Sequence, residues 1–232
     1  GMTSMEKRLG ADLMVVPQDT AQKAEALLTN GNPSTFYFTR DIASEVKQAD
    51  GIEQTSEQTY ISSLAAACCD EKLQIIGYDP STDFVIEPWV ASQFKGTLED
   101  GKMIAGANVN VSADGTIELY GRKWPVVAQL ANTGTSLDNS VFINQATVPD
   151  MVAASSKVSK QVMPMEYAGK AVSTVMIKVK QGYEAQTVAE NIKRIDSRFA
   201  DLGYVYPGGI TANTKTSLTA LVTYLKVFVA VI

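Results

Sequence analysis

Short apolar runs alternate with stretches of helical spacing over the first third of the chain. Residues 11–17, ADLMVVP, form an apolar run that a proline ends, which predicts a buried strand. Residues 19–31 predict a short helix that ends near an Asn-Gly pair, and residues 39–51 predict a second helix with its glycine in the C′ position. Residues 52–67 indicate a long extended segment, and residues 73–78, LQIIGY, indicate a further strand. The order so far is strand, helix, strand, strand.

The pattern changes between residues 83 and 144, where short runs typical of β structure replace helical spacing. Residues 103–111 and 117–120 flank Asp114-Gly115, and an Asp-Gly pair between two alternating runs predicts a hairpin turn. No helix longer than a turn or two is expected in this part. The sequence therefore predicts a small all-β insertion.

Helix and strand signals return after residue 146. Residues 147–158 begin with a threonine cap, an early proline and an acid, which predict a helix. Residues 173–180 alternate between apolar and polar positions and predict a strand, as do residues 204–206. Between these strands, apolar residues at helical spacing predict an amphipathic helix that ends at Gly203. These apolar residues are Val188, Ile192, Ile195, Phe199 and Leu202.

The outer parts together predict an α+β fold. The expected architecture is a split β-α-β sandwich of the ferredoxin-like or porter-like kind, with helices on one face of a mixed sheet and a small all-β lobe inserted. The predicted divisions are residues 1–82 for the first half of the α/β lobe, 83–146 for the inserted lobe and 147–215 for the second half. Both ends of the α/β lobe are expected to lie close together.

The last segment, residues 216–232, is almost wholly apolar from Leu218 onward, with Lys226 as its only charge. A helix that spans a bilayer needs about 20 apolar residues, so this segment is too short to cross. It predicts the start of a truncated transmembrane helix, which would make the preceding residues an extramembrane domain. The alternative is a C-terminal core helix, which Tyr224 and Lys226 permit.

Composition excludes several kinds of function. The chain has 232 residues, of which 45% are hydrophobic and 19% are charged, so it can bury a core and is not disordered. A net charge of -5 without a long basic run argues against nucleic acid as a partner. The sequence has no histidine, which removes His-based catalytic triads and His metal ligands. An ordinary hydrolase is therefore disfavoured, although carboxylate, Lys, Tyr or Cys chemistry stays open.

Three segments resemble the MacB-like periplasmic core domain, which belongs to FtsX-like permease subunits of ABC transporters. Residues 8–17, RLGADLMVVP, resemble the first strand of that domain, and GADLMVVP is the most specific part. Residues 73–79, LQIIGYD, resemble the strand that closes its first half. Residues 138–143, DNSVFI, resemble the late β segment of its insertion, which a helix follows. The order of the lobes, with a membrane helix after them, is also similar.

The resemblance implies an extracytoplasmic domain, periplasmic or extracellular, that flanking helices hold in the cell membrane. Such permeases form homodimers or heterodimers and pair with a cytoplasmic ATPase, and this chain has no G-x-x-x-x-G-K-[ST] phosphate loop of its own. ATP hydrolysis would move the outer domain, which would contact substrate or partner proteins and transmit conformational change for export or release. The resemblance implies no catalytic residue, no metal ligand and no cofactor in this domain.

Cys68 and Cys69 are the most unusual pair in the sequence because they are adjacent. Cysteines outside the cytoplasm tend to be oxidised, but neighbours can join only as a strained vicinal disulfide. A metal site that includes Asp70 and Glu71 is a rival interpretation, although two adjacent thiols lack the spacing of structural zinc. Two reduced thiols in a turn are the third interpretation. Mass measurement after alkylation distinguishes them in part, because modification of both thiols without prior reduction would exclude a disulfide.

Several carboxylates are candidates for a functional role. Asp12 lies inside an apolar run, where a role at a strand edge or as a cap is favoured over a buried functional carboxylate. Asp79, Asp83 and Glu87 are close in sequence and suggest a cation site. Their spacing fits no EF-hand loop, however, and residues 79–82 predict a turn instead.

Aromatic residues of the insertion could form a binding surface, although packing across a small sheet is the commoner use of such side chains. They are Trp89, Tyr120 and Trp124. Gly208-Gly209 is interpreted as a flexible joint rather than a phosphate loop. Two other functions stay open: a secreted or surface-anchored module that binds a ligand between its lobes, and an enzyme. The enzyme is the weaker of the two, because no catalytic constellation is visible.

Overall fold

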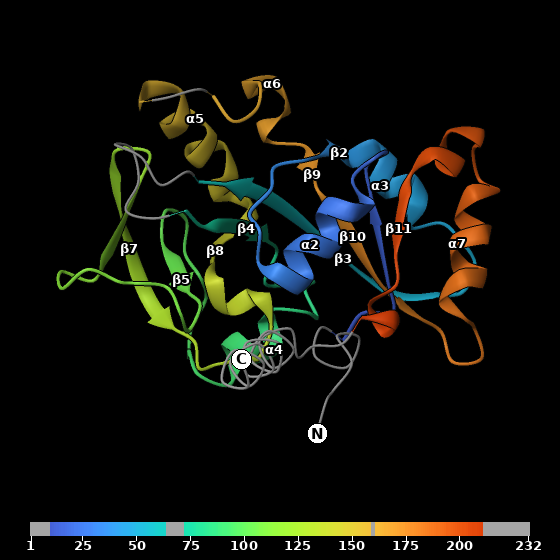
Figure 1. Cartoon of the computed structure of the whole chain (residues 1–232), viewed down its shortest axis with the longest axis horizontal. Helices are drawn as coiled ribbons and strands as arrows, with labels where there is room; N and C mark the ends of the chain where they lie inside the picture. The colour runs from blue at the N-terminus through green and yellow to red at the C-terminus, as the bar shows by residue number, and fades with distance from the viewer. Residues whose placement is uncertain (1–9, 64–71, 159–160, 211–232) are drawn as a thin grey trace, which may run out of the picture.

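One mixed sheet of nine strands runs through the part of the molecule that the structure describes (Figure 1). The computed structural model describes residues 10–63, 72–158 and 161–210. In chain order the strands are β1 (Leu13–Val16), β3 (Ile52–Ser62), β4 (Gln74–Tyr78), β5 (Met103–Ala105), β6 (Thr116–Leu119), β7 (Arg122–Gln129), β8 (Ser140–Asn144), β10 (Thr174–Val179) and β11 (Gly203–Val205). Across the sheet their order is β11-β1-β10-β3-β4-β8-β5-β7-β6. A separate small ladder joins β2 (Phe38–Thr39) to β9 (Ala171–Val172).

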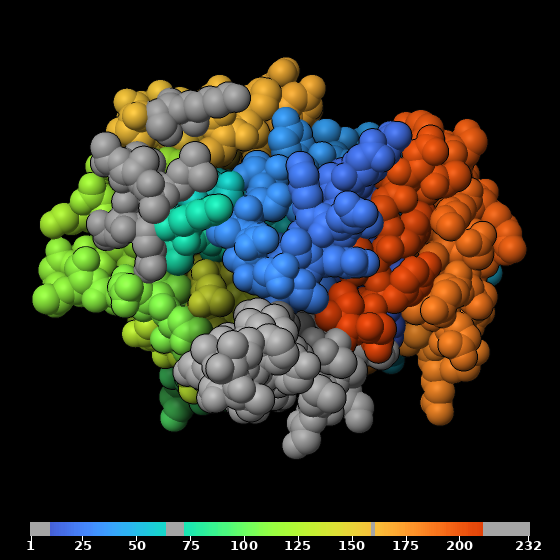
Figure 2. Space-filling view, in the orientation of Figure 1, coloured from blue at the N-terminus to red at the C-terminus, as the bar shows by residue number. Residues whose placement is uncertain are grey.

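Helices cover both faces of the large sheet. On one face lie α2 (Ala21–Asn30) and α4 (Glu87–Ala91). The other face carries α3 (Arg40–Val46), α5 (Val148–Val158) and α7 (Ala185–Lys193), with α6 (Met165–Ala168) against α5. The short 3-10 turns are η1 (Ser136–Asn139), η2 (Gln145–Thr147), η3 (Ser197–Asp201) and η4 (Pro207–Gly209). Figure 2 shows the blue segment that contains α2 lying against the red segment that contains β11, which agrees with the contacts between these two elements.

Alternation of side chains along the strands assigns residues to the two faces. In β1, Met14 belongs to the core under α2 and α4, whereas Leu13 and Val15 belong to the core under α3 and α7. In β3, Tyr60 lies on the first of these faces and Ile61 on the second, under α5. Full burial of an apolar side chain of this kind stabilises the fold by about 1.5–3 kcal/mol. The chain therefore gains stability on both faces of one sheet.

The chain enters and leaves the described fold at one end of the sheet. β1 and β11 are neighbouring antiparallel strands, and Met14 lies opposite Val205. Ala11, before β1, and Ile210, after β11, both pack into the core under α2 and α4. The expectation that the ends of the α/β lobe lie close together is confirmed.

The α+β class is confirmed, but the more specific split ferredoxin-like sandwich is not. β10 and β11 do lie on either side of β1 and are both antiparallel to it, with α7 between them in the chain. Helices nevertheless occupy both faces, and the sheet continues through β4 and β8 into strands of the expected insertion. The physical reason is that β4 has apolar residues on both faces, so both faces need a covering layer.

The domain divisions at residues 82 and 146 stay predictions. So does the truncated membrane helix, because residues 216–232 lie outside the described ranges. In the ranges that the structure does describe, none of the helices combines the length and the apolar character needed to span a bilayer.

The hairpin of the insertion turns at a different pair of residues from the predicted one. β6 pairs with β7 through Tyr120 and Gly121, which have φ angles of 54° and 71°. Two successive residues with positive φ form the kind of two-residue turn that suits the twist of a hairpin. Asp114-Gly115 instead forms the turn before β6, where the Gly115 amide donates to the Ser112 carbonyl at 2.9 Å. The prediction at Asp114-Gly115 was therefore wrong for the hairpin.

Two helix ends also differ from the prediction. α7 ends at Lys193, and a separate turn, η3, follows after Asp196, whose side chain accepts a hydrogen bond from the Arg198 amide. The predicted single helix to Leu202 was wrong because Asp196 caps a new turn instead of continuing the old one. Gly51 is not the C′ residue of α3, which ends at Val46.

Candidate functional site

A surface groove lies between α3 and η3, beside the point where β1 ends. Its volume is about 360 Å³. The lining residues come from three segments that are distant in sequence: Pro17, Gln18, Phe38, Ile42, Arg198, Phe199, Asp201 and Leu202. The described chain enters the sheet at the start of β1, and Pro17 and Gln18 of the groove follow the end of β1. The groove therefore lies at the opposite end of the sheet from the chain entry.

The floor of the groove is apolar because two aromatic side chains are buried there. Phe38 is 7% exposed and lies in β2, and Phe199 is 1% exposed and lies in η3. Ile42 of α3 and Leu202 after η3 remain only partly buried. Part of the apolar surface of the groove is therefore left in contact with water.

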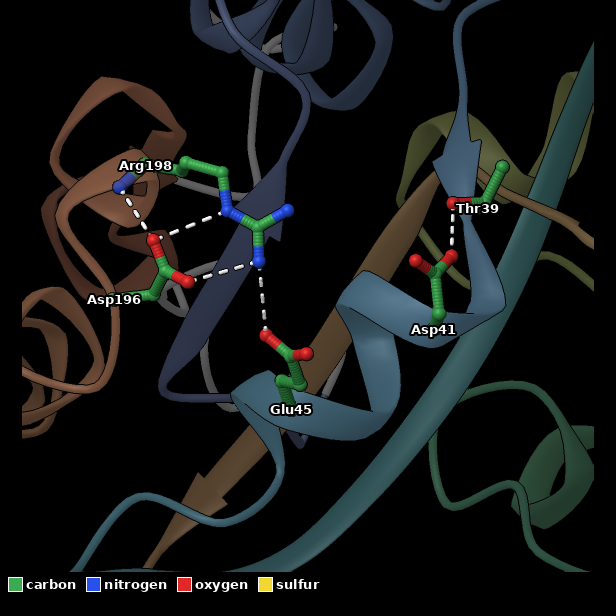
Figure 3. Close-up of polar contacts among 5 residues, drawn as sticks. All are labelled: Thr39, Asp41, Glu45, Asp196 and Arg198. Carbon is green, nitrogen blue, oxygen red and sulfur yellow. Dashed lines mark hydrogen bonds and ion pairs between the residues drawn. The ribbon is translucent and has the colours of Figure 1, made fainter.

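Charged groups at one side of the groove form a small network (Figure 3). The Arg198 side chain donates to Asp196 from Nε at 3.1 Å and from Nη2 at 2.9 Å. The same Nη2 lies 3.3 Å from the Glu45 carboxylate of α3. The network thus joins η3 to α3, but exposed ion pairs of this kind contribute little to stability.

Hydrogen bonds move the pKa values of Asp196, Arg198 and Asp41 further from neutrality. The Arg198 side chain lowers the pKa of Asp196, and Asp196 in turn raises the pKa of Arg198. At the start of α3, the hydroxyl of Thr39, the residue before the helix, donates to Asp41 and lowers the pKa of that carboxyl. The local balance is acidic, because Arg198 is the cation of the network and is shared between two carboxylates.

Little in the sequence indicates this groove. The predicted helix through residues 188–202 places Phe199 and Leu202 in one apolar stripe that packs on the core. A continuous helix of this kind leaves no groove at that position. Arg198 lay on the polar side of that helix, where a solvated charge is ordinary. A break in the helix at Asp196, an N-cap residue type, was the available clue.

A second, wider hollow is open and lined mainly by polar residue types, with a volume of about 700 Å³. Each of two acids at its edge already has donors of its own. Asp79 accepts from the Ser81 amide at 2.9 Å and from its hydroxyl at 2.6 Å, and Asp100 accepts from the Asn144 side chain at 2.6 Å. No group of three or more acidic or cysteine side chains among the described residues is arranged to hold a metal ion.

The predicted turn at residues 79–82 is present, but the carboxylates near it have separate roles. Asp79 bonds within the turn. Asp83 is buried and accepts from backbone amides and from the Ser56 hydroxyl. Glu87 accepts from the Tyr78 hydroxyl at 3.2 Å, and burial raises its pKa. Each of these acids therefore accepts hydrogen bonds from its own partners within the fold.

The remaining candidates among the described residues also have partners within the fold. Asp12 accepts from the Val179 amide at 2.8 Å, which is the strand-edge role that the sequence favoured. Trp124 is fully buried, and its indole donates to the Leu119 carbonyl at 3.1 Å. Tyr120 donates through its hydroxyl to the Ser62 carbonyl, Trp89 packs against the core under α4, and Gly208-Gly209 forms part of η4. Cys68 and Cys69 lie outside the described residues, so the vicinal disulfide stays a prediction.

Comparison with known proteins identifies the fold. No family model matches the sequence, and no curated protein matches it. The structure is similar to the crystal structure of the periplasmic region of MacB from Actinobacillus actinomycetemcomitans, with a TM-score of 0.51 and 10% identity over 87% of this chain and 92% of that chain. The chain has the fold of the MacB periplasmic region. This confirms the resemblance that the sequence indicated. A second similar structure is the extracellular domain of the ABC-type transporter YknZ from Gram-positive bacteria, with a TM-score of 0.44 and 13% identity over 84% of this chain and 98% of that chain.

The groove and the two ends of the described fold lie at opposite ends of the sheet. The ends meet where β1 begins and β11 finishes, and the groove opens where β1 finishes and η3 leads into β11. The two ends of the sheet therefore differ. The described chain enters and leaves at one end, and an apolar groove flanked by acids lies at the other.

Proposed function

We propose that this chain is the extracytoplasmic domain of an ABC-type permease and that it carries conformational change from the membrane to a partner, without catalysis of its own. The observation that carries the proposal is the antiparallel pairing of β1 with β11, which brings both ends of the described fold to one end of the sheet. A domain between two membrane helices needs this arrangement, because both helices enter the same bilayer. The fold of the MacB periplasmic region supports the proposal.

The continuous sheet suits a domain that transmits motion. β4 and β8 pair in parallel from Gln74 opposite Ser140 to Tyr78 opposite Asn144. This ladder joins strands on both sides of it by backbone hydrogen bonds, so a tilt of one part of the sheet moves the other. A rigid body of this kind passes on a displacement instead of absorbing it.

The proposal extends to the anchor and the partners. The apolar residues 218–232 would begin the helix that enters the membrane, and the complete permease would act as a dimer with a cytoplasmic ATPase. The outer end of the domain would contact substrate or partner proteins during export or release.

Labelling of the complete gene product tests the location. A Gln181→Cys variant in a background without Cys68 and Cys69 places one thiol in an exposed turn. We expect the protein to stay in the membrane fraction after alkaline carbonate extraction. We also expect a membrane-impermeant maleimide to label Gln181→Cys on intact spheroplasts, and the parent without cysteines to stay unlabelled.

Labelling only after the cells are lysed would overturn the extracytoplasmic location. Recovery of the protein in the culture medium would overturn the membrane anchor and would favour a secreted binding module. Co-purification with an ATPase subunit from detergent-solubilised membranes tests the partner, and its absence under conditions that keep the permease intact would count against an ABC transporter.

A further inference from the structure

The groove between α3 and η3 offers room for apolar side chains. Phe38 and Phe199 form its buried floor, and Ile42 and Leu202 stand at its sides with part of their surface exposed. Covering such surface releases water and is favourable. A volume of about 360 Å³ is at the small end of the range for ligand sites, so it fits one or two side chains of leucine size and not a folded domain.

The charge around the groove selects the ligand further. Asp41 and Glu45 lie on α3, and Asp196 and Asp201 lie at the two ends of η3. Arg198 is the cation among them, and its side chain is already shared by Asp196 and Glu45. Arg198 lines the groove as Asp201 does, and Arg40 and Lys47 of the α3 segment pair with Glu57 of β3. Counted together, five carboxylates and three cations leave a negative surplus, which attracts a cationic group and repels an acidic one.

We infer that this groove binds a short segment of a partner protein that presents a leucine-sized side chain next to a lysine or arginine. The apolar side chain covers Ile42 and Leu202 above the aromatic floor. The neighbouring cation lies over the carboxylates, with Asp201 on the groove wall itself. The inference rests on the proposed function in one respect, the position of the groove. The groove lies at the end of the domain that would point away from the membrane, where a second extracytoplasmic protein can reach it.

The probe is a synthetic peptide, acetyl-Gly-Ser-Leu-Lys-Leu-Lys-Ser-Gly-amide, with a fluorescent label on a second sample. The 232-residue chain is titrated with it, and anisotropy gives Kd while backbone amide spectra locate the site. We expect Kd in the sub-millimolar range and shifts that centre on residues 38–42 and 198–202. A peptide with Glu in place of both Lys residues should bind at least fivefold more weakly.

Matched variants separate the groove from general effects of charge. Asp201→Lys reverses an exposed carboxylate on the groove wall, and Glu25→Lys reverses another exposed carboxylate on α2, on the opposite face of the sheet. We expect Kd to rise about fivefold for Asp201→Lys, as loss of an interfacial charge contact allows, and to stay within twofold for Glu25→Lys. Ile42→Asn should raise Kd about tenfold, whereas Met165→Asn, at an exposed apolar position of α6, should not change it.

The inference fails under three outcomes. It fails if no shift occurs in the groove at millimolar peptide, or if both peptides bind equally well. It also fails if the spectra of the free chain show shifts at the groove that depend on protein concentration, because a second copy would then be the occupant. These outcomes do not depend on membrane location. Peptide binding with failed spheroplast labelling would refute the permease proposal and keep the groove, and the reverse result would refute the groove alone.

Discussion

Replacement of Asp83 with alanine tests how the face of the sheet under α4 is held together. One oxygen of this buried carboxylate accepts from three successive backbone amides, those of Val85 at 2.9 Å, Ile86 at 2.6 Å and Glu87 at 2.8 Å. The other oxygen accepts from the Ser56 hydroxyl of β3 at 2.6 Å. One side chain thus organises the start of α4 and ties it to the sheet.

The magnitude follows from what alanine leaves behind. Four donors would lose their acceptor, and a buried donor without a partner costs about 1–3 kcal/mol. Water reaches part of the α4 start after truncation, so we expect the free energy of unfolding to fall by about 3–4 kcal/mol. Ser56→Ala removes one of the same bonds and should cost about 1 kcal/mol. The double variant should lose little more than Asp83→Ala, because the two changes share a bond.

Urea denaturation followed by circular dichroism gives these free energies, and Asp114→Ala is the matched control. Asp114 also accepts from a backbone amide and a hydroxyl, both of Thr116, at 3.2 and 2.7 Å. Its side chain is 50% exposed, so water replaces the lost bonds, and the cost should stay below about 1 kcal/mol. Equal losses for Asp83→Ala and Asp114→Ala would refute the reasoning, because burial is the difference between the two sites.

Two further predictions concern a close backbone approach and a partly buried acid. A side chain at Gly106 would place its Cβ 2.4 Å from the Leu137 carbonyl oxygen, so Gly106→Ala should lower the free energy of unfolding by about 2 kcal/mol; Gly169→Ala, which meets nothing within 4 Å, should change it by less than about 0.5 kcal/mol in the same thermal melts. Burial raises the pKa of Glu87 above its ordinary value of 4.5, so the folded state holds this proton more tightly than the unfolded state does, and stability falls as pH rises through the raised pKa. Glu87→Gln should therefore be more stable than the parent at pH 7 and no more stable at pH 4, and an equal gain at both pH values would contradict the assignment to ionisation.

Elements with a strong local signal could be predicted from the sequence. The run 11–17 contains β1, and the run 73–78 contains β4, because compact apolar segments with a polar or proline boundary fit a buried strand. The helix expected to end near Asn30-Gly31 is α2, and Gly31 has the left-handed conformation that favours glycine at a helix end, with a φ of 66°. These features depend on neighbours in sequence and need no tertiary partner.

Errors arose where a tertiary contact outweighed the local signal. Tyr120 adopts a positive φ, which is rare for a tyrosine, while its hydroxyl donates to the Ser62 carbonyl 58 residues away. This bond, together with the burial of Trp124, fixes the hairpin turn at Tyr120-Gly121. The Asp114-Gly115 pair had the better turn chemistry but no comparable partner in the core. Turn propensity amounts to a fraction of a kcal/mol, and a buried aromatic residue contributes more.

Neither the groove nor the pairing of β4 with β8 could be predicted from the sequence, because both depend on contacts between distant segments. Parallel pairing of β4 with β8 joins residues 66 positions apart, from Gln74 to Ser140, and no local pattern records which two apolar strands become neighbours. The groove likewise unites residues 17–18, 38–42 and 198–202, each of which is ordinary in its own segment. Once the sheet order is known, the end of β1 and the start of β11 are neighbours, at the end of the sheet remote from the point where the described chain enters and leaves. The packing of α3, β2 and η3 at that end leaves an apolar groove, and under the inferred binding the acids of α3 and η3 select the charge of what fills it.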